Sequence, residues 1–149
     1  VVASIRTPQY ELKLYKAIAF VPKQENAEGS RLKPDHRYLV LDISVQNTAK
    51  TKEVDMGQVL LSAKLQDKKG RTYPLNAMAV ASFTLENPDP EHQAQYNALW
   101  GKLKPGETYR TKAVGFDVPT TAKEFSLSMN ADDNSQPDSK RQQLKFTLE

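Results

Sequence analysis

The chain has 149 residues, with 21 Lys and Arg against 18 Asp and Glu, and no Cys. Its length is typical of one domain, and its hydrophobic share of 38% lies below the roughly 45–50% of average globular domains, so we expect one small core. The absence of Cys excludes disulfides, thiolate metal sites and cysteine nucleophiles. Opposite charges are interspersed, which argues against a nucleic-acid-binding arm, and no apolar run reaches the roughly 18 residues of a membrane-spanning helix.

Strict alternation of apolar and polar residues predicts β-strands, because successive side chains of a strand point to opposite faces of a sheet. The first such segment covers residues 10–20, and its shared apolar face carries Tyr10, Leu12, Leu14, Ile18 and Phe20. Lys16 interrupts this face and predicts a bulge or an edge position. After an exposed loop predicted at residues 23–34, residues 38–47 are predicted as a core strand with an inward face of Leu39, Leu41, Ile43 and Val45.

Residues 59–67 are predicted as the next strand, with an inward face of Val59, Leu61, Ala63 and Leu65. Residues 67–73 have the composition of a hairpin, in which Gly70 takes the positive φ that closes a short loop. A weaker strand is predicted at residues 80–85. One short helix is predicted near residues 88–100, because capping residues and prolines stand at its start and Gly101 stands at its end.

Three further alternating segments predict strands at residues 114–118, 125–129 and 144–148. Pro119 ends the first of them, and residues 130–140 are predicted to form a long hairpin tip between the other two. Together the segments predict an all-β fold, an antiparallel β-sandwich of about 7–8 strands. It forms a single domain over residues 1–149, with its core at about 10–149. A small barrel is the alternative.

Four motifs carry a resemblance to a known family: Tyr38-Leu39-Val40-Leu41-Asp42-Ile43-Ser44-Val45-Gln46-Asn47-Thr48, the hairpin of residues 67–73, Gly101-Lys102-Leu103-Lys104-Pro105-Gly106-Glu107-Thr108, and Val114-Gly115-Phe116-Asp117-Val118-Pro119. By their order and spacing the chain resembles, over roughly residues 10–130, bacterial immunoglobulin-like domains of unassigned function. Members occur in secreted proteins and in envelope lipoproteins, and a secreted mycobacterial immunogen is similar in fold. The resemblance implies an immunoglobulin-like sandwich in a secreted, periplasmic or envelope-anchored protein, and it supplies no catalytic residues.

The motifs also have structural interpretations. Asn47 ends a strand where its side chain can satisfy the backbone groups of a turn, and Pro105-Gly106 favours a turn before the next strand. The long segment from Glu86 to Leu99 departs from a compact version of the family pattern. Variable loops on a rigid sandwich are the usual place for binding, so an individual function is expected there.

Residue spacing does not support a metal site. His36 and His92 lie in separate segments without a His-x-x-x-His partner, so each is interpreted as an exposed loop or strand-edge residue. Residues 132–137 look like the start of a calcium loop but lack its glycine and its bidentate glutamate. A looser calcium site is left open, built from Glu86, Asp89 and Glu91, although an acidic helix start explains these residues as well. We expect no metal and no cofactor.

The sequence contains no Gly-x-Ser-x-Gly motif and no phosphate-binding glycine motif. Ser82 lies in a strand-like run, and the carboxylates Glu53 and Asp55 are interpreted as part of a charged strand face. A catalytic triad assembled in space is left open. A surface for nucleic acid would use Tyr109, Arg110 and Lys112, but a net charge of +3 gives little drive from counterion release. No nucleic-acid partner is expected.

The remaining class is binding of a protein, peptide or glycan by the loops or an edge strand of the sandwich. Candidate contact residues are Tyr96, Leu99 and Trp100, because large side chains of this kind suit interfaces; the alternative is that Trp100 plugs one end of the sandwich. We expect a non-enzymatic extracytoplasmic binding or assembly module at the cell envelope; an N-terminal lipid anchor outside this chain is left open as its one route of membrane attachment. The alternatives are a small hydrolase with a loop-borne site and a carrier of a small ligand or ion at residues 86–100.

Overall fold

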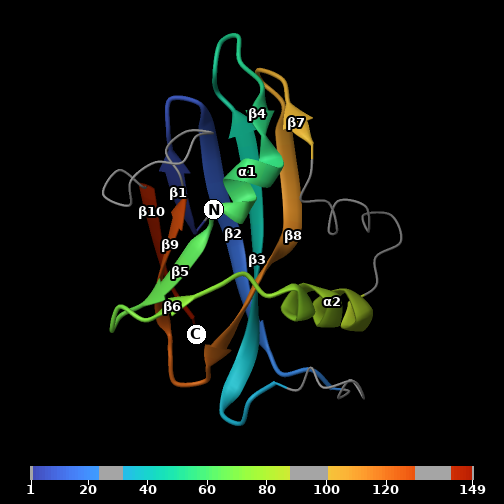
Figure 1. Cartoon of the computed structure of the whole chain (residues 1–149), viewed down its shortest axis with the longest axis vertical. Helices are drawn as coiled ribbons and strands as arrows, with labels where there is room; N and C mark the ends of the chain where they lie inside the picture. The colour runs from blue at the N-terminus through green and yellow to red at the C-terminus, as the bar shows by residue number, and fades with distance from the viewer. Residues whose placement is uncertain (1, 24–31, 88–100, 130–141, 149) are drawn as a thin grey trace.

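A computed structural model describes the chain except for residues 1, 24–31, 88–100, 130–141 and 149. In chain order the described elements are β1 (Ala3–Arg6), β2 (Tyr10–Phe20), β3 (His36–Asn47), β4 (Val54–Asp55), α1 (Met56–Leu61), β5 (Lys64–Asp67), β6 (Thr72–Tyr73), α2 (Ala77–Glu86), β7 (Lys102–Leu103), β8 (Thr108–Pro119), β9 (Glu124–Met129) and β10 (Gln142–Thr147). Strands dominate this order, and both described helices are short (Figure 1). The predicted all-β sandwich is therefore confirmed.

Two four-stranded antiparallel sheets form the layers of the sandwich (Figure 1). The first sheet has the strand order β1-β2-β3-β8, and the second sheet has the order β10-β9-β5-β6. The two-residue strands β4 and β7 pair with each other separately. In the first sheet, β3 pairs with β2 on one side and with β8 on the other. Four of the seven described strand pairings join consecutive strands, and three join distant parts of the chain: β3 with β8, β5 with β9 and β4 with β7.

The core lies between the two sheets. The predicted inward face of β3 is confirmed, because Leu39, Leu41, Ile43 and Val45 are all 0% exposed. The second sheet contributes the other half of the same apolar cluster, with Leu65, Phe125, Leu127, Leu144 and Phe146. Burying large apolar side chains contributes about 1.5–3 kcal/mol each, so this interface is the main source of stability of the sandwich.

The irregularity predicted at Lys16 is confirmed. The pairing of β2 with β3 shifts its register between Leu14 and Lys16, and this bulge changes which side chains face the core. Before the bulge Leu14 is fully buried between the sheets, whereas after it Ala17 and Ala19 pack against that core. Ile18 and Phe20 therefore turn to the outer face, where they pack in a second apolar cluster. The shared face expected for all of these residues is wrong beyond the bulge.

The strand predicted at residues 59–67 is only half correct. Its second part is β5, with Leu65 buried, but its first part is the end of helix α1. Asp55 caps this helix by accepting a hydrogen bond from the backbone N–H of Gln58 at 3.3 Å. The helix buries Met56, Val59 and Leu60, which have helical spacing, and leaves Leu61 51% exposed. The helical spacing of the buried residues, and not the apparent alternation of Val59, Leu61 and Ala63, therefore describes this segment.

The weak strand predicted at residues 80–85 is wrong, because these residues belong to α2. Asn76 caps this helix by accepting from the backbone N–H of Ala79 at 3.1 Å, and the alanines that follow favour helix. The helix buries Ala79 and Phe83 against the outer face of the first sheet. The helix predicted at residues 88–100 lies outside the described residues.

The α2 helix approaches the first sheet closely at one glycine. A Cβ atom added at Gly115 of β8 would lie 2.9 Å from the Ala79 Cβ and 3.0 Å from the Val80 Cγ2. Both distances are shorter than ordinary van der Waals contact. The missing side chain at Gly115 is therefore what allows the helix to lie on the sheet.

The remaining predicted strands are confirmed. β8 ends at Pro119, and β9 pairs antiparallel with β10, while the predicted hairpin tip between β9 and β10 lies outside the described residues. The short strands β1, β4 and β7 were not predicted, because two to four residues carry too little alternation. Within the described ranges, neither helix has the length and apolar character needed to span a membrane.

Candidate functional site

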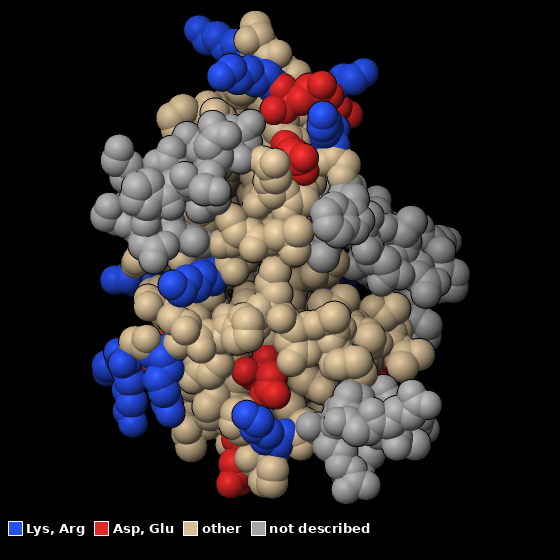
Figure 2. Space-filling view, in the orientation of Figure 1, with Lys and Arg blue, Asp and Glu red and all other residues tan. Residues whose placement is uncertain are grey.

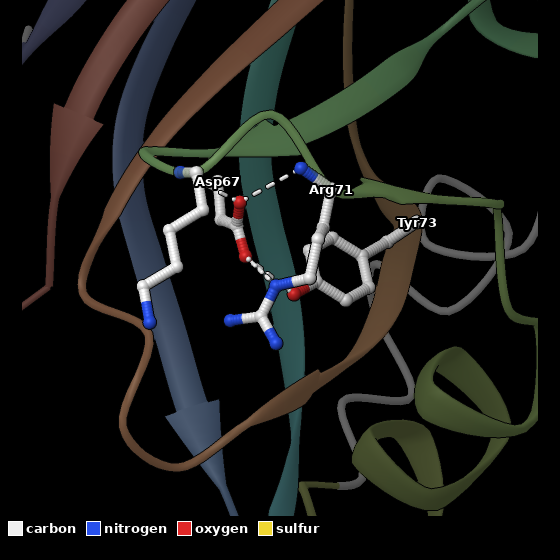
Figure 3. Close-up of polar contacts among 4 residues, drawn as sticks. Asp67, Arg71 and Tyr73 are labelled. Carbon is white, nitrogen blue, oxygen red and sulfur yellow. Dashed lines mark hydrogen bonds and ion pairs between the residues drawn. The ribbon is translucent and has the colours of Figure 1, made fainter.

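One carboxylate holds the hairpin between β5 and β6 in shape. Asp67 accepts hydrogen bonds from the backbone N–H groups of Lys69 and Arg71, both at 2.9 Å. The Arg71 Nε and the Tyr73 hydroxyl also donate to Asp67, both at 2.8 Å (Figure 3). Gly70 has a φ of +83°, in the left-handed region that glycine adopts without a steric penalty. The predicted hairpin is confirmed, and four donors to one side chain fix its tip.

Burial and hydrogen bonding act in opposite directions on Asp67. Its side chain is only 4% exposed, and this burial raises the pKa of the carboxyl. Hydrogen bonds from Tyr73 and Arg71 lower the pKa by more than burial raises it, so the pKa of Asp67 lies below its ordinary value. Burial, together with the bond to Asp67, raises the pKa of Tyr73 to about 12. Near neutral pH Asp67 is ionised and Tyr73 is neutral, and Arg71 compensates the carboxylate charge locally.

Two hollows flank the hairpin and share a wall formed by Asp67, Lys68, Glu124 and Thr147. The first hollow, of about 420 Å³, is completed by Phe125 and Ser126 of β9 and by Lys145 and Phe146 of β10. The second, of about 470 Å³, is completed by Lys69, Arg71 and residues 121–123 of the turn between β8 and β9. We call this surface, made of residues 67–71, 121–126 and 145–147, the hairpin end.

Basic side chains dominate the hairpin end. Five exposed cations line its hollows: Lys68, Lys69, Arg71, Lys123 and Lys145. Among the lining residues the exposed carboxylate is Glu124, which pairs with Lys68 at 3.3 Å. Figure 2 shows basic side chains gathered at the lower left, where Figure 1 places the β5–β6 hairpin. A concave surface lined by one sign of charge concentrates ions of the opposite sign, so the hairpin end favours anions.

A second polar cluster lies on the outer face of the first sheet. Asp42 is 7% exposed and accepts from the Nε and Nη2 atoms of Arg110, each at 3.0 Å. The Arg110 guanidinium lies 4.1 Å from the centre of the Tyr15 ring, and the Tyr15 hydroxyl lies 3.0 Å from the Ser44 Oγ. These groups satisfy one another in charge and hydrogen bonding. We interpret the cluster as packing that closes the sheet surface.

The residues considered for catalysis do not converge in the described part of the chain. The His36 Nδ1 lies 2.7 Å from the Asp117 Oδ1, but no hydroxyl of the described residues is bonded to this ring. Ser82 lies in α2, and Asp55 caps α1. No group of three or more His, Asp and Glu residues that could hold a metal ion occurs within the described ranges.

Several predicted site residues lie outside the described residues: Tyr96, Leu99 and Trp100, His92, Asp89, Glu91 and residues 132–137. Their roles stay predictions. Glu86 is described, and its carboxylate accepts a hydrogen bond from the backbone N–H of Lys23. Tyr109 and Arg110 diverge, because Tyr109 packs against the core while Arg110 binds Asp42 on the outer face. A shared stacking surface of these two residues is not formed.

The hairpin end was missed as a site, although its hairpin was predicted. Lys68, Lys69 and Arg71 form a visible basic tip in the sequence, but Lys123 and Lys145 join it only through the pairing of β5 with β9 and of β9 with β10. The signal that could have pointed to it is the Asp-Lys-Lys-Gly-Arg hairpin itself, since it presents three cations within four residues.

The family model described as "Domain of unknown function (DUF4352)" matches residues 11–140 of the chain. No curated protein matches this chain.

Three solved structures are similar in fold. The lipoprotein candidate YcdA of Bacillus subtilis matches with a TM-score of 0.67 and 12% identity, over 97% of this chain and 38% of its own. The YjhA protein of Bacillus subtilis matches with a TM-score of 0.62 and 14% identity, over 98% of this chain and 96% of its own. A conserved hypothetical protein of Bacillus anthracis matches with a TM-score of 0.60 and 18% identity, over 87% of each chain. The chain thus spans well under half the length of YcdA, and all three likenesses support the sandwich.

Proposed function

The chain belongs to the family described as domain of unknown function DUF4352, and we propose that this member is a non-enzymatic, extracytoplasmic binding or assembly module that recognises its partner through the hairpin end. The observation that carries the proposal is the fixed shape of this surface. Asp67 accepts four hydrogen bonds from Lys69, Arg71 and Tyr73, and these bonds hold the hairpin that exposes Lys68 and Lys69. A binding surface that is already ordered loses little conformational entropy when a partner arrives.

Two features favour recognition over bond chemistry. Cationic side chains line the hollows of the hairpin end, together with two pairs of opposite charges, Lys68 with Glu124 and Arg71 with Asp67. A general acid or base is expected to be a group such as His or a carboxyl poised near the working pH. Asp67 is instead fully engaged in holding the hairpin, and the pKa of its carboxyl is lowered.

An envelope location is supported by the resemblance of the fold to YcdA, which is named as a lipoprotein candidate. A lipid-anchored module would be held close to the charged polymers and proteins of the envelope, which raises the effective concentration of both partners. Fractionation of cells that express the full-length precursor tests this part: recovery of the protein outside the cytoplasm is expected, and recovery in the cytoplasm alone contradicts it.

Binding to isolated bacterial envelopes tests the function itself. The chain should cosediment with an envelope fraction, and the pair Lys68→Glu and Lys69→Glu should reduce the bound fraction at least about fivefold, because reversing charge at the surface removes attraction. The matched control is the pair Lys50→Glu and Lys52→Glu, which changes the net charge equally. These control lysines are exposed and follow β3 at the opposite end of the molecule (Figure 1).

Two results would contradict the proposal. One is equal loss of cosedimentation in both variant pairs, because the loss would then follow from the net charge of the chain and not from the hairpin end. The other is turnover of an envelope-derived substrate that disappears on a single substitution at the hairpin end.

The segment of residues 86–100, with Tyr96, Leu99 and Trp100, is retained in the proposal as a second contact region.

A further inference from the structure

The positive charge of the hairpin end is available to a ligand. Lys69, Lys123 and Lys145 are exposed and have no ion-pair partner among the described residues. Lys68 pairs with Glu124, but their side chains are 81% and 54% exposed, and water screens such a surface pair strongly. An arriving anion therefore competes against weak internal contacts.

The one buried carboxylate of this surface opposes an anion little. Asp67 is 4% exposed, and Arg71 Nε binds it at 2.8 Å. This pair is close to neutral as a unit, so the lysines around it set the sign of the local field. The hollows on either side of Asp67 then give an anionic group a place to sit between Lys68 and Lys145, or between Lys69 and Lys123.

The basic groups favour phosphate over carboxylate. A carboxylate is matched best by the flat fork of a free arginine, which gives it two parallel hydrogen bonds. At the hairpin end the one arginine is Arg71, whose Nε is bonded to Asp67, so only the outer edge of its guanidinium is left for a ligand. Four lysines remain, each a compact charge on a flexible stem. Separate ammonium groups can approach a tetrahedral phosphate from several sides, and the hydroxyls of Ser126 and Thr147 line the same hollow.

The surface lacks the features of a nucleic-acid or a bilayer site. The Tyr73 hydroxyl is bonded to Asp67, and its ring packs edge-on against Phe125 at 6.5 Å between centroids, so it is not free to stack on bases. None of the large apolar side chains that are exposed in the described ranges, Val2, Val21, Leu61 and Leu85, lines either hollow. Nothing there supplies the apolar face that inserts into a membrane surface.

We propose that the two hollows of the hairpin end bind successive phosphate groups of a water-soluble anionic polymer. This inference deepens the proposed function and rests on it, because it names the class of partner that the module would recognise at the envelope.

The test measures binding of linear polyphosphate to the full chain by isothermal titration calorimetry. Saturable binding is expected, weakening as salt is added because charge neutralisation drives it. The pair Lys68→Glu and Lys69→Glu, and separately Lys123→Gln and Lys145→Gln, should each weaken binding at least about tenfold. The pair Lys50→Glu and Lys52→Glu should leave it within about twofold. Matching urea-unfolding midpoints for all variants exclude misfolding as the cause.

Two further probes separate phosphate from other anions and sources. Poly-glutamate of equal charge should bind at least about tenfold more weakly than polyphosphate, because a carboxylate finds four lysines here and only one arginine, which is already partly bonded to Asp67. Vesicles that contain phosphatidylglycerol should retain a small fraction of the chain in a sedimentation assay. Soluble polyphosphate should displace a larger fraction of the chain from bacterial envelopes. Equal affinity for poly-glutamate, binding to vesicles alone, or equal sensitivity in the Lys50 and Lys52 variant would each overturn the inference.

The proposed function and the phosphate inference are contradicted by different results. If the chain binds envelopes through Lys68 and Lys69 but ignores polyphosphate, the proposed function stands and the phosphate inference falls. If it does not bind envelopes at all, the proposed function falls even where polyphosphate binds.

Discussion

Among single residues, Asp67 has the largest effect on the geometry of the proposed surface. Replacing it with Asn keeps the shape of the side chain but removes the charge that Arg71 and Tyr73 bind. Hydrogen bonds to a charged group contribute about 1.5–3 kcal/mol, so Asp67→Asn should lower the free energy of unfolding by an amount in that range, measured by urea unfolding at neutral pH. An unchanged midpoint would show that the hairpin does not depend on this carboxylate.

The pH dependence of stability follows from the same residue. Because the pKa of Asp67 is lower in the folded chain, its stabilisation is complete above the ordinary carboxyl pKa and is lost as the pH falls through the lowered value. The wild-type chain should therefore lose stability below about pH 4 more steeply than Asp67→Asn does. Parallel acid unfolding curves of the two proteins would contradict this assignment.

Tyr73 gives the matching prediction at high pH. Its pKa is raised from 10.0 to about 12 in the folded chain, so its contribution to stability is fully present below pH 10 and is lost as the pH rises through the folded value. Titration of tyrosinate absorbance should show one group ionising near pH 12 that is missing in Tyr73→Phe. A difference between the two titrations centred near pH 10 would contradict it.

Asn47 is a residue whose structural role the sequence did indicate. It is 1% exposed; its Nδ2 donates to the carbonyls of Lys52 and Leu103, and its Oδ1 accepts from the Ala49 N–H, all at 2.8 Å. Asn47→Asp keeps the acceptor but cannot donate while ionised. Leaving buried groups without partners costs about 1–3 kcal/mol each, so this variant should lose about 2–5 kcal/mol in urea unfolding, and part of the loss should be recovered in acid. A loss below 1 kcal/mol would show that the turn is held by other contacts.

At the level of elements, the docking of α2 on β8 depends on Gly115. Gly115→Ala should destabilise the chain by about 1–3 kcal/mol, the usual effect of overpacking, because its Cβ would lie 2.9 Å from the Ala79 Cβ. Adding Ala79→Gly removes the opposing atom and should recover part of the loss beyond what the two single variants predict together. Additive effects in this double-mutant cycle would contradict direct contact.

The sequence was most informative where a strand has one face in the core. Residues 125–129 alternate strictly, and residues 39–45 place an apolar residue at every second position; both are strands, although Tyr38 and Val40 are also buried on the other face of β3. It failed where two periods overlap: Val59, Leu61, Ala63 and Leu65 alternate, but Met56, Val59 and Leu60 also fit a helix, and only the cap at Asp55 distinguishes the two. The helix α2 was missed because its apolar residues cover a sheet surface that the sequence does not reveal.

The candidate site was harder to predict than the fold. The hairpin was visible as a local turn, because Gly70 and its polar neighbours are contiguous in the sequence. Lys123 and Lys145 reach the same surface because β9, whose hairpin with β10 was expected, pairs with the distant strand β5. Alternation determines which face a residue occupies but not which strands are neighbours, so the gathering of charge could not be read from spacing.

As a whole, the molecule is a β-sandwich with a basic surface at the hairpin end. Pre-organised binding surfaces usually move little when a partner binds, so a ligand should perturb residues near its site and few others. Charge elsewhere is more evenly mixed: the end near Lys50 and Lys52 also carries Glu53 and Asp55.

The most direct measurement is an amide-resonance titration of the full chain with linear polyphosphate, followed by nuclear magnetic resonance. We expect the largest shifts within residues 67–71, 121–126 and 145–147, and we expect these shifts to shrink in the Lys68→Glu and Lys69→Glu pair. Largest shifts around Asp42 and Arg110, or around Lys50 and Lys52, would contradict it, as would a spectrum that polyphosphate leaves unchanged.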